Sequence, residues 1–301
     1  MDLGGGLRLL KEFAYERPAT VADAVALLQG SGARALAGGT DLIPQMREGR
    51  RPVERVVDLK RISALNVIEE LPDGGIVIGA AATASAIARH PLIAAHYPAI
   101  AASVCLIGSL QVQNRASLGG NVCNAAPSAD GVPALICHGA LARIAGPGGE
   151  RETDLQGLFA GPGRTTLEPG EILTAIVLPP PAPRSAAHYL RFTPRREMDI
   201  AVAGVGGWVR LEENGTIAEA RLALASVGPT PLRAPSAEKM LIGARPSREL
   251  VEEAGRLAAG DARPISDTRG TAEFRRTLVS VLTGRVLAAC CRALGEEVDA
   301  P

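Results

Sequence analysis

The amino-acid sequence predicts an α+β protein with two domains, and three observations lead to this prediction. The chain has 301 residues, which exceeds the usual size of a single small domain. Hydrophobic residues make up 47% of it and charged residues 21%, as in ordinary globular proteins. A proline-rich stretch at 179–183 separates two parts, both of which mix short apolar runs with helical patterns. We therefore expect one domain at 1–180 and a smaller α+β domain at 186–296.

The first part contains signals for several short elements. Thr20 and the helical spacing after it predict a capped helix, which Gly30 and Gly32 end. The elements expected after this helix, in chain order, are strands at 33–37 and 56–59, a hairpin of 67–68 with 76–78, helices at 83–89 and 99–107, and strands at 141–145 and 172–178.

The second part begins with a predicted strand–turn–strand unit. Residues 201–211 and 217–226 are apolar runs on either side of Asn214-Gly215, a dipeptide typical of tight hairpin turns. The remainder, 236–294, has a mainly helical pattern. This part should therefore combine an antiparallel sheet with helices.

The composition excludes several classes of function. Lys and Arg together number 32, as do Asp and Glu, so the chain lacks the basic excess of a nucleic-acid-binding protein. The five cysteines form no C-x-x-C pair, which argues against a disulfide framework, a zinc site or an iron–sulfur cluster. No segment has the roughly 20 apolar residues of a transmembrane helix, and the N-terminus does not resemble a secretory signal. We expect a cytoplasmic protein without a metal site.

Common catalytic and nucleotide-binding motifs are missing as well. The sequence contains neither the G-x-G-x-x-G of dinucleotide-binding folds nor the G-x-x-x-x-G-K-[ST] of triphosphate-binding loops. It also lacks the G-x-S-x-G of serine hydrolases. No residue of this chain is therefore predicted to be catalytic.

Two segments with paired glycines stand out, at 35–42 (ALAGGTDL) and 114–122 (NRASLGGNV). Consecutive glycines can adopt positive φ and expose backbone N–H groups in an anion-binding nest. Thr40, Ser117 and Asn121 add polar side chains at the same places. Neither segment contains a lysine, which favours a diphosphate gripped by backbone groups from both sides. The alternative is two ordinary tight turns.

Five stretches, the glycine segments among them, match a known pattern. They are AGGTDL at 37–42, RASLGGNVCNAAPSAD at 115–130, GPGRTTLEPGEIL at 161–173, RFTPRREMDIA at 191–201 and EFRRTLVSVLTGRVL at 273–287. In these stretches the chain resembles the flavoprotein subunits of the molybdenum hydroxylases, such as the medium subunit of carbon monoxide dehydrogenase and the flavin domain of xanthine dehydrogenase. The resemblance implies a two-part FAD-binding domain of the vanillyl-alcohol-oxidase/PCMH type, divided near residue 62, and then a smaller α+β domain.

The resemblance also implies which residues contact FAD. Asp130 would hydrogen-bond the cofactor, Ile107 and Leu173 would flank the flavin, and Arg191 would be a basic flavin contact. Each has a structural alternative: core packing for Ile107 and Leu173, a helix N-cap for Asp130 and a solvated charge for Arg191. The first segment has no His, Cys or Tyr, so we expect non-covalent FAD. The residues expected to bind FAD are Ala35, Leu36, Ala37, Gly38, Gly39, Thr40, Asp41, Leu42, Ile107, Ala116, Ser117, Gly119, Gly120, Asn121, Asp130, Ile172, Leu173 and Arg191.

The function follows from the same resemblance. In related complexes a large molybdenum–pterin subunit oxidises the substrate, and two-iron, two-sulfur clusters in a small subunit pass the electrons to FAD. This chain would hold that FAD in a dimer of heterotrimers and reduce NAD, a quinone or another acceptor. The alternative is a self-contained FAD-dependent oxidoreductase of the vanillyl-alcohol-oxidase-like class, for which Glu197 is the only nearby acid or base. The substrate, the acceptor and the individual roles of Arg195 and Arg196 stay open.

Overall fold

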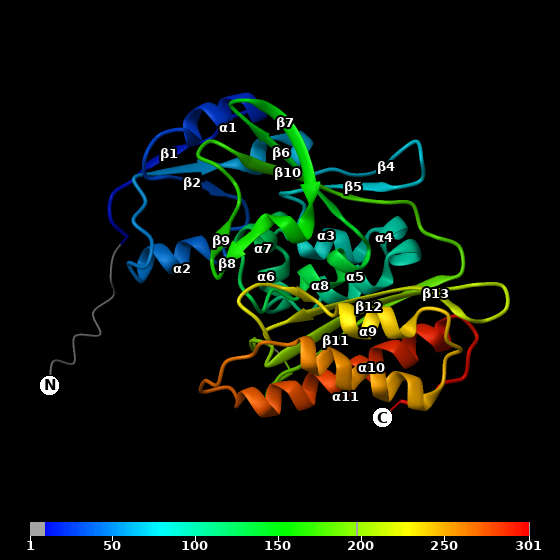
Figure 1. Cartoon of the computed structure of the whole chain (residues 1–301). Helices are drawn as coiled ribbons and strands as arrows, with labels where there is room; N and C mark the ends of the chain where they lie inside the picture. The colour runs from blue at the N-terminus through cyan, green and yellow to red at the C-terminus, as the bar shows by residue number, and fades with distance from the viewer. Residues whose placement is uncertain (1–9, 197, 301) are drawn as a thin grey trace, which may run out of the picture.

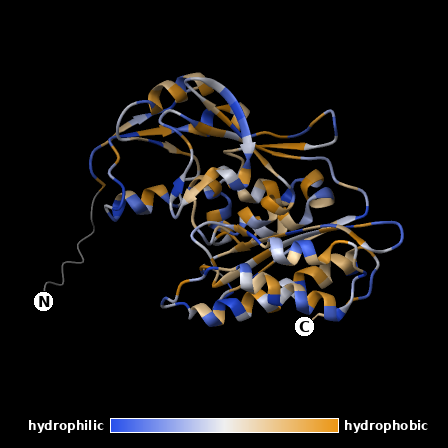
Figure 2. Cartoon of the chain, viewed as in Figure 1, coloured by the Kyte–Doolittle hydropathy of each residue, from blue (hydrophilic) through white to orange (hydrophobic). Residues whose placement is uncertain are grey.

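The computed structural model describes residues 10–196 and 198–300. Figure 1 shows small sheets at the top, short helices in the middle, and a sheet of longer strands with helices α9, α10 and α11 at the bottom. In Figure 2 the hydrophobic residues gather in the central helices and the strands next to them, and the lower helices also present hydrophilic residues. None of the described helices has the length and apolar character needed to cross a membrane.

The first sheet is three-stranded and parallel, with the order β1-β3-β2. Its strands are β1 (Ala14–Glu16), β2 (Ala33–Leu36) and β3 (Arg55–Asp58). Helix α1 (Val21–Leu28) connects β1 to β2, and the Thr20 hydroxyl accepts the Asp23 N–H at 3.1 Å, as the predicted cap requires. Helix α2 (Leu42–Arg47) follows β2. The first glycine segment thus lies at the carboxyl end of a parallel strand, where open α/β sheets place ligands.

The second sheet has five antiparallel strands in the order β4-β5-β10-β6-β7. The expected hairpin is confirmed, with Ile68 paired to Ile78. The bounds are β4 (Ile68–Glu70), β5 (Ile76–Gly79), β6 (Leu141–Gly146), β7 (Gly149–Asp154) and β10 (Ile172–Leu178). Around it lie the 3-10 helices η1 (Leu59–Arg61), η2 (Ser63–Leu65) and η3 (Leu155–Leu158), and the strand pair β8 (Phe159–Gly161) with β9 (Arg164–Thr165).

The chain between β5 and β6 forms six short helices. They are α3 (Ala84–Arg89), α4 (Pro91–His96), α5 (Pro98–Val104), α6 (Leu110–Gln113), α7 (Leu118–Cys123) and α8 (Gly131–Cys137). Apolar side chains of these helices, such as Ile87, Ile100 and Leu135, are fully buried and form one core with the five-stranded sheet, whereas Leu110 of α6 is exposed.

The C-terminal part is a four-stranded antiparallel sheet, in the order β11-β12-β13-β14, packed against helices. The predicted strand–turn–strand unit is confirmed as β12 and β13. Strand β11 was not predicted, because it is a half-buried edge strand without a clear apolar pattern. The bounds are β11 (Ser185–Phe192), β12 (Ala203–Leu211), β13 (Ile217–Ala225), β14 (Leu232–Arg233), α9 (Pro235–Leu241), α10 (Arg248–Asp261) and α11 (Ala272–Ala293).

The two parts share a core although the proline stretch at 179–183 separates their sheets. Trp208 of β12 and Ala223 of β13 belong to the same buried cluster as the six short helices. Helix α8 packs against β11, β12 and β13. The C-terminal sheet is therefore fixed directly behind the helix that follows the second glycine segment.

Candidate functional site

The first glycine segment turns sharply between β2 and α2. Gly39 has a φ of +77°, a conformation that other residues adopt only with strain. A Cβ on Gly38 would lie 2.1 Å from the carbonyl oxygen of Arg115, which belongs to the second segment. The Lys60 ammonium donates to the Ala37 carbonyl at 3.2 Å and pairs with the Asp58 carboxylate at 2.7 Å. The segment is therefore held against both the sheet and the second glycine segment.

The second glycine segment differs from the prediction, because it is the first turn of a helix. Gly119 and Gly120 lie inside α7, and neither has positive φ, so the expected nest of two left-handed glycines is wrong here. Ser117 is the N-cap, and its hydroxyl accepts the Gly120 N–H at 3.0 Å. A Cβ on Gly119 would lie 2.5 Å from the Ala80 carbonyl oxygen. Close packing explains Gly119, and the N–H groups of the first turn of α7 are already paired with Ala82, Ala80 and Ser117.

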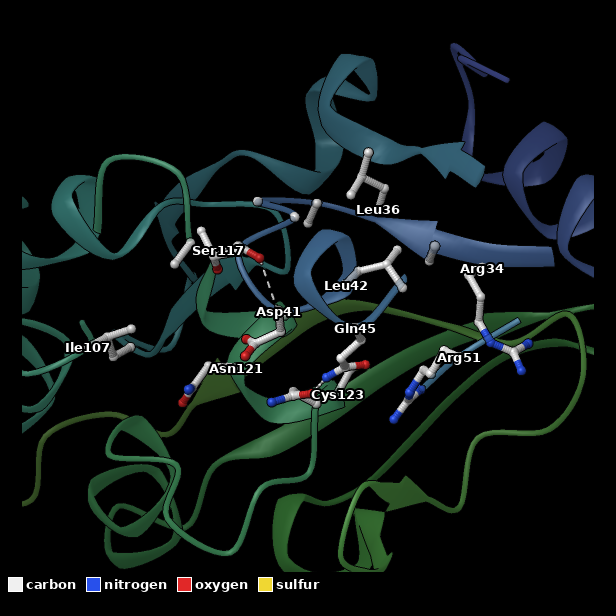
Figure 3. A pocket seen from close by; sticks show the side chains of 18 residues that line it. Arg34, Leu36, Asp41, Leu42, Gln45, Arg51, Ile107, Ser117, Asn121 and Cys123 are labelled. Atoms are coloured by element: carbon white, nitrogen blue, oxygen red, sulfur yellow. Dashed lines mark hydrogen bonds between the residues drawn. The ribbon is translucent and has the colours of Figure 1, made fainter. Parts of the chain in front are cut away.

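The two segments line one pocket of about 210 Å³ (Figure 3). The Gln45 side chain in α2 donates to the Asn124 side chain after α7 at 3.1 Å, which ties the two helices together below the pocket. The predicted residues that line it are Ala35, Leu36, Ala37, Gly38, Gly39, Thr40, Asp41, Leu42, Ile107, Ala116, Ser117, Gly120 and Asn121. Most of the predicted site, drawn from the two glycine segments and Ile107, is therefore brought together.

The polar groups of the pocket fit a ligand with phosphates and hydroxyls. Within the described residues, the backbone N–H groups of Gly39, Thr40 and Asp41 have no protein acceptor. The side-chain oxygen of Asn121 is buried and has no hydrogen-bond partner there either. Buried polar atoms usually have a partner. The pocket thus offers N–H donors for an anion and one unpaired acceptor, the Asn121 oxygen, for a hydroxyl. FAD carries both a diphosphate and hydroxyl groups.

Charge in the pocket is uneven along its length. Figure 3 shows Ile107 at one end and Arg34 and Arg51 at the other, with Asp41 and Asn121 between them. Desolvation by the pocket walls raises the pKa of Asp41 above its ordinary value, although the side chain keeps access to solvent. The Arg51 guanidinium donates to the Gly163 carbonyl at 3.2 Å. One end is therefore cationic and the other apolar.

Several pocket residues were not predicted: Arg34, Gln45, Arg51, Cys123 and Asn124. Cys123 and Asn124 come two and three residues after Asn121, at the end of α7, so extending the predicted segment by one turn would have found them. No sequence signal singles out Arg51, which reaches the pocket from the chain after α2. Burial raises the pKa of the Cys123 thiol to about 12, so this thiol stays protonated and is a poor nucleophile at neutral pH.

Five predicted residues lie outside the pocket. Gly119 faces Ala80, which directly follows β5. Ile172 and Leu173 on β10 are each 3% exposed and pack in the core, so their contact with a flavin stays a prediction. Asp130 and Arg191 form a buried ion pair between α8 and β11.

The Asp130 carboxylate is a junction between the two parts of the chain. One oxygen accepts the Tyr189 hydroxyl at 2.8 Å, and the other accepts the Arg191 guanidinium. Asp130 is the N-cap residue of α8, but its side chain makes no capping bond, and Arg191 is not a solvated charge. The contacts of Asp130 and Arg191 with FAD stay predictions. Burial raises the pKa of Asp130 to about 6 in spite of Arg191. Tyr189, which the sequence did not single out, completes this junction.

The segment after β11 contains the remaining candidates. Glu197 lies outside the described residues. The Arg195 guanidinium pairs with Asp199, and Arg196 is exposed.

Comparisons with known proteins agree with this geometry. Residues 11–181 match the family of FAD-binding domains in molybdopterin dehydrogenase, and residues 188–290 match the CO dehydrogenase flavoprotein C-terminal domain. A putative xanthine dehydrogenase FAD-binding subunit of Escherichia coli K12 is 34% identical over 288 residues, covering 95% of this chain and 98% of the relative. The carbon monoxide dehydrogenase medium chain of Afipia carboxidovorans is 37% identical over 279 residues, covering 91% and 95%.

Solved structures show the same relationship. A chain of reconstituted CO dehydrogenase from Oligotropha carboxidovorans superposes with a TM-score of 0.90 at 34% identity, covering 94% of this chain and 99% of that one. The predicted fold, a two-part FAD-binding domain and a smaller C-terminal domain, is confirmed. The chain belongs to the FAD-binding medium subunits of the molybdenum hydroxylase family, whose molybdenum–pterin and iron–sulfur cofactors reside in other subunits.

Proposed function

We propose that FAD lies along the pocket, with its diphosphate between the two glycine segments. The observation that supports this most is the approach of the Gly38 backbone to Arg115, because it brings the free N–H groups of Gly39, Thr40 and Asp41 into the same narrow space as the second segment. Backbone donors at helix N-termini and tight turns are suited to a diphosphate. The pocket's apolar end, at Ile107, would take the flavin side, and Arg34 and Arg51 would lie toward the adenosine.

Residues in and beside the pocket have different tasks in this proposal. FAD, when bound, supplies the chemistry, since it takes up and releases electrons singly or in pairs. Ser117 caps α7 and thereby fixes its first turn beside the cofactor. The Asn121 oxygen accepts a hydroxyl of the cofactor. Arg34 and Arg51 offset the phosphate charge, and Asp130 with Arg191 holds the C-terminal sheet beside the flavin side of the site.

The wider role follows from the relatives. We infer that electrons arrive from clusters in a small iron–sulfur subunit, after a large molybdenum–pterin subunit has oxidised the substrate, and leave for NAD, a quinone or another acceptor. The names of the relatives, a xanthine dehydrogenase subunit and a carbon monoxide dehydrogenase medium chain, support this placement. A dimer of such heterotrimers in the cytoplasm is the assembly that we propose. The domain limits 1–180 and 186–296 belong to the same proposal.

Expression of the chain alone and with its two partner subunits tests this function. The isolated chain should bind FAD and show no substrate-driven dye reduction with aldehydes, purines or N-heterocycles. Turnover should appear when both partners are present. A Gly38→Ala chain, which should lose FAD, is the cofactor-free control for the complex. Robust turnover by the isolated chain would favour the self-contained oxidoreductase.

A further inference from the structure

A second cavity lies where the two parts of the chain meet. Its volume is about 480 Å³, and none of the residues that line it lines the pocket between the glycine segments. Its walls come from the junction of α4 and α5, from the proline stretch at 179–183, and from the neighbouring strands β11, β12 and β13. We call it the junction cavity, because a molecule inside it would touch both parts of the chain.

The walls of the junction cavity are mainly apolar and partly aromatic. Trp208 on β12 is 6% exposed, and Ala187 is its cross-strand neighbour on β11. Tyr97 is buried, and its hydroxyl donates to the Pro179 carbonyl at 2.6 Å, so this hydroxyl is already bound. An apolar and aromatic lining with few polar groups is typical of small-molecule sites.

The charged side chains that line the junction cavity neutralise each other. The Arg221 guanidinium donates to the Glu219 carboxylate through Nε at 2.8 Å and through Nη2 at 2.6 Å, and through Nη1 to the Cys137 carbonyl at 3.3 Å. It also lies over the Trp208 ring, 4.6 Å from the centroid. Each guanidinium nitrogen thus has a protein partner already, so the lining favours an uncharged ligand over an anion.

His138 brings an unsatisfied polar atom to the junction cavity. The residue is 8% exposed, and its Nε2 is buried without a hydrogen-bond partner among the described residues. The Tyr97 ring meets the imidazole edge to face, with centroids 5.2 Å apart. Burial and the Arg221 charge lower the pKa of His138 to about 4, so the imidazole is neutral at pH 7. Buried polar atoms usually have a partner, and a ligand in this cavity could supply it.

We infer that the junction cavity binds a small, uncharged aromatic alcohol, with its hydroxyl on the Nε2 of His138 and its ring against Trp208. A hydroxyl can donate to Nε2 or accept from it, so it suits either tautomer of the neutral imidazole. An aromatic ring suits walls that are themselves aromatic, because such rings stack or meet edge to face. The inference goes beyond the proposed function and does not depend on it, since the junction cavity and the FAD pocket share no residue.

Titration of the FAD-loaded full chain at pH 7 with p-cresol, toluene and p-toluate tests the inference. Trp208 is the only tryptophan in the sequence, so its fluorescence reports binding in the junction cavity. We expect p-cresol to bind saturably and at least about tenfold more tightly than toluene, because only the phenol gives Nε2 a partner. The anionic p-toluate should not bind. Saturating p-cresol should also raise the midpoint of thermal unfolding.

Two variants locate the binding site. His138→Phe keeps an aromatic ring and removes Nε2, so the affinity for p-cresol should fall about tenfold to that for toluene, which should not change. Ala187→Leu places a larger side chain beside Trp208 and should abolish binding of both compounds. His90→Phe is the matched control, because the Nδ1 of His90 is also buried without a partner in the described residues but lies outside the junction cavity. It should bind p-cresol like the wild type.

The FAD content should be unchanged in all three variants, since none of the three positions lines the FAD pocket. Equal affinities of the wild type for p-cresol and toluene would overturn the inference, as would tighter binding of p-toluate. So would wild-type affinity for p-cresol in His138→Phe and Ala187→Leu, or an equal loss in His90→Phe. Release of FAD by p-cresol would place the phenol in the cofactor pocket and would overturn it as well.

Discussion

The two glycine segments both contain a pair of consecutive glycines, but these glycines have different structural roles. In the first segment Gly39 needs positive φ, and Gly38 allows two backbones to approach. In the second, both glycines are helical, and only Gly119 is required by a close backbone neighbour. Paired glycines therefore indicate close packing around a ligand site more dependably than they indicate a particular backbone conformation.

The largest effect is expected for Gly38→Ala, which tests the contact between the two segments. Its Cβ would lie 2.1 Å from the Arg115 carbonyl oxygen, so the segments must separate. We expect a loss of about 3 kcal/mol in unfolding free energy and loss of FAD. Urea unfolding and flavin absorbance measure these. Gly148→Ala, whose Cβ meets nothing within 4 Å, should change neither; wild-type FAD content in Gly38→Ala would contradict the pocket described here.

Gly119→Ala and Gly120→Ala should separate the two glycines of the second segment. A Cβ on Gly119 meets the Ala80 backbone at 2.5 Å, whereas one on Gly120 meets only the Ser117 hydroxyl at 2.9 Å. We expect Gly119→Ala to cost about 2 kcal/mol. Gly120→Ala should stay within about 0.5 kcal/mol of the wild type, because alanine favours the helix. Thermal unfolding of the FAD-free proteins compares them, and equal losses would argue against the helical second segment.

Asn121→Leu should change stability and FAD affinity in opposite directions. The Asn121 oxygen is buried without a partner in the described residues, so removing it should stabilise the FAD-free chain by about 1 kcal/mol. The same change removes an acceptor for the cofactor and should weaken FAD binding about fivefold. Titration with FAD and urea unfolding give both values. Asn114→Leu, at an exposed position, is the control, and a parallel fall in both quantities would refute the assignment.

Asp41→Asn should give the smallest change in unfolding free energy, and this change should depend on pH. It tests a titrating carboxyl group that the first glycine segment has and the second segment lacks. Because desolvation raises the pKa of Asp41 above 3.8, the folded chain disfavours the carboxylate. The wild type therefore loses stability as the pH rises from about the ordinary pKa through the raised one. The variant should be more stable at pH 7, by less than about 1 kcal/mol, and equal below pH 4. Melting curves across this pH range measure the difference in stability between the variant and the wild type. A difference that does not change with pH would exclude titration of Asp41.

Some elements could be predicted from the sequence and others could not. The helix after Thr20, the hairpin pairing Ile68 with Ile78, and the unit around Asn214-Gly215 follow local rules of capping, alternation and turns. Strand β11 could not be predicted, because a half-buried edge strand leaves no regular apolar pattern. Helices α2 and α7 are six residues long, too short for a helical period to show.

The sequence alone determined the family, the cofactor class and most of the pocket residues. These depend on short motifs whose residue types are set by contacts to the ligand and by close backbone packing. Only the tertiary structure decided that Gly119 faces Ala80, that Asp130 pairs with Arg191 and Tyr189, and that Arg51 reaches the pocket. It also decided that His138 and residues of separate elements line one cavity. The reason is physical: such contacts join residues distant in the chain, and local patterns contain no information about which distant surfaces will meet.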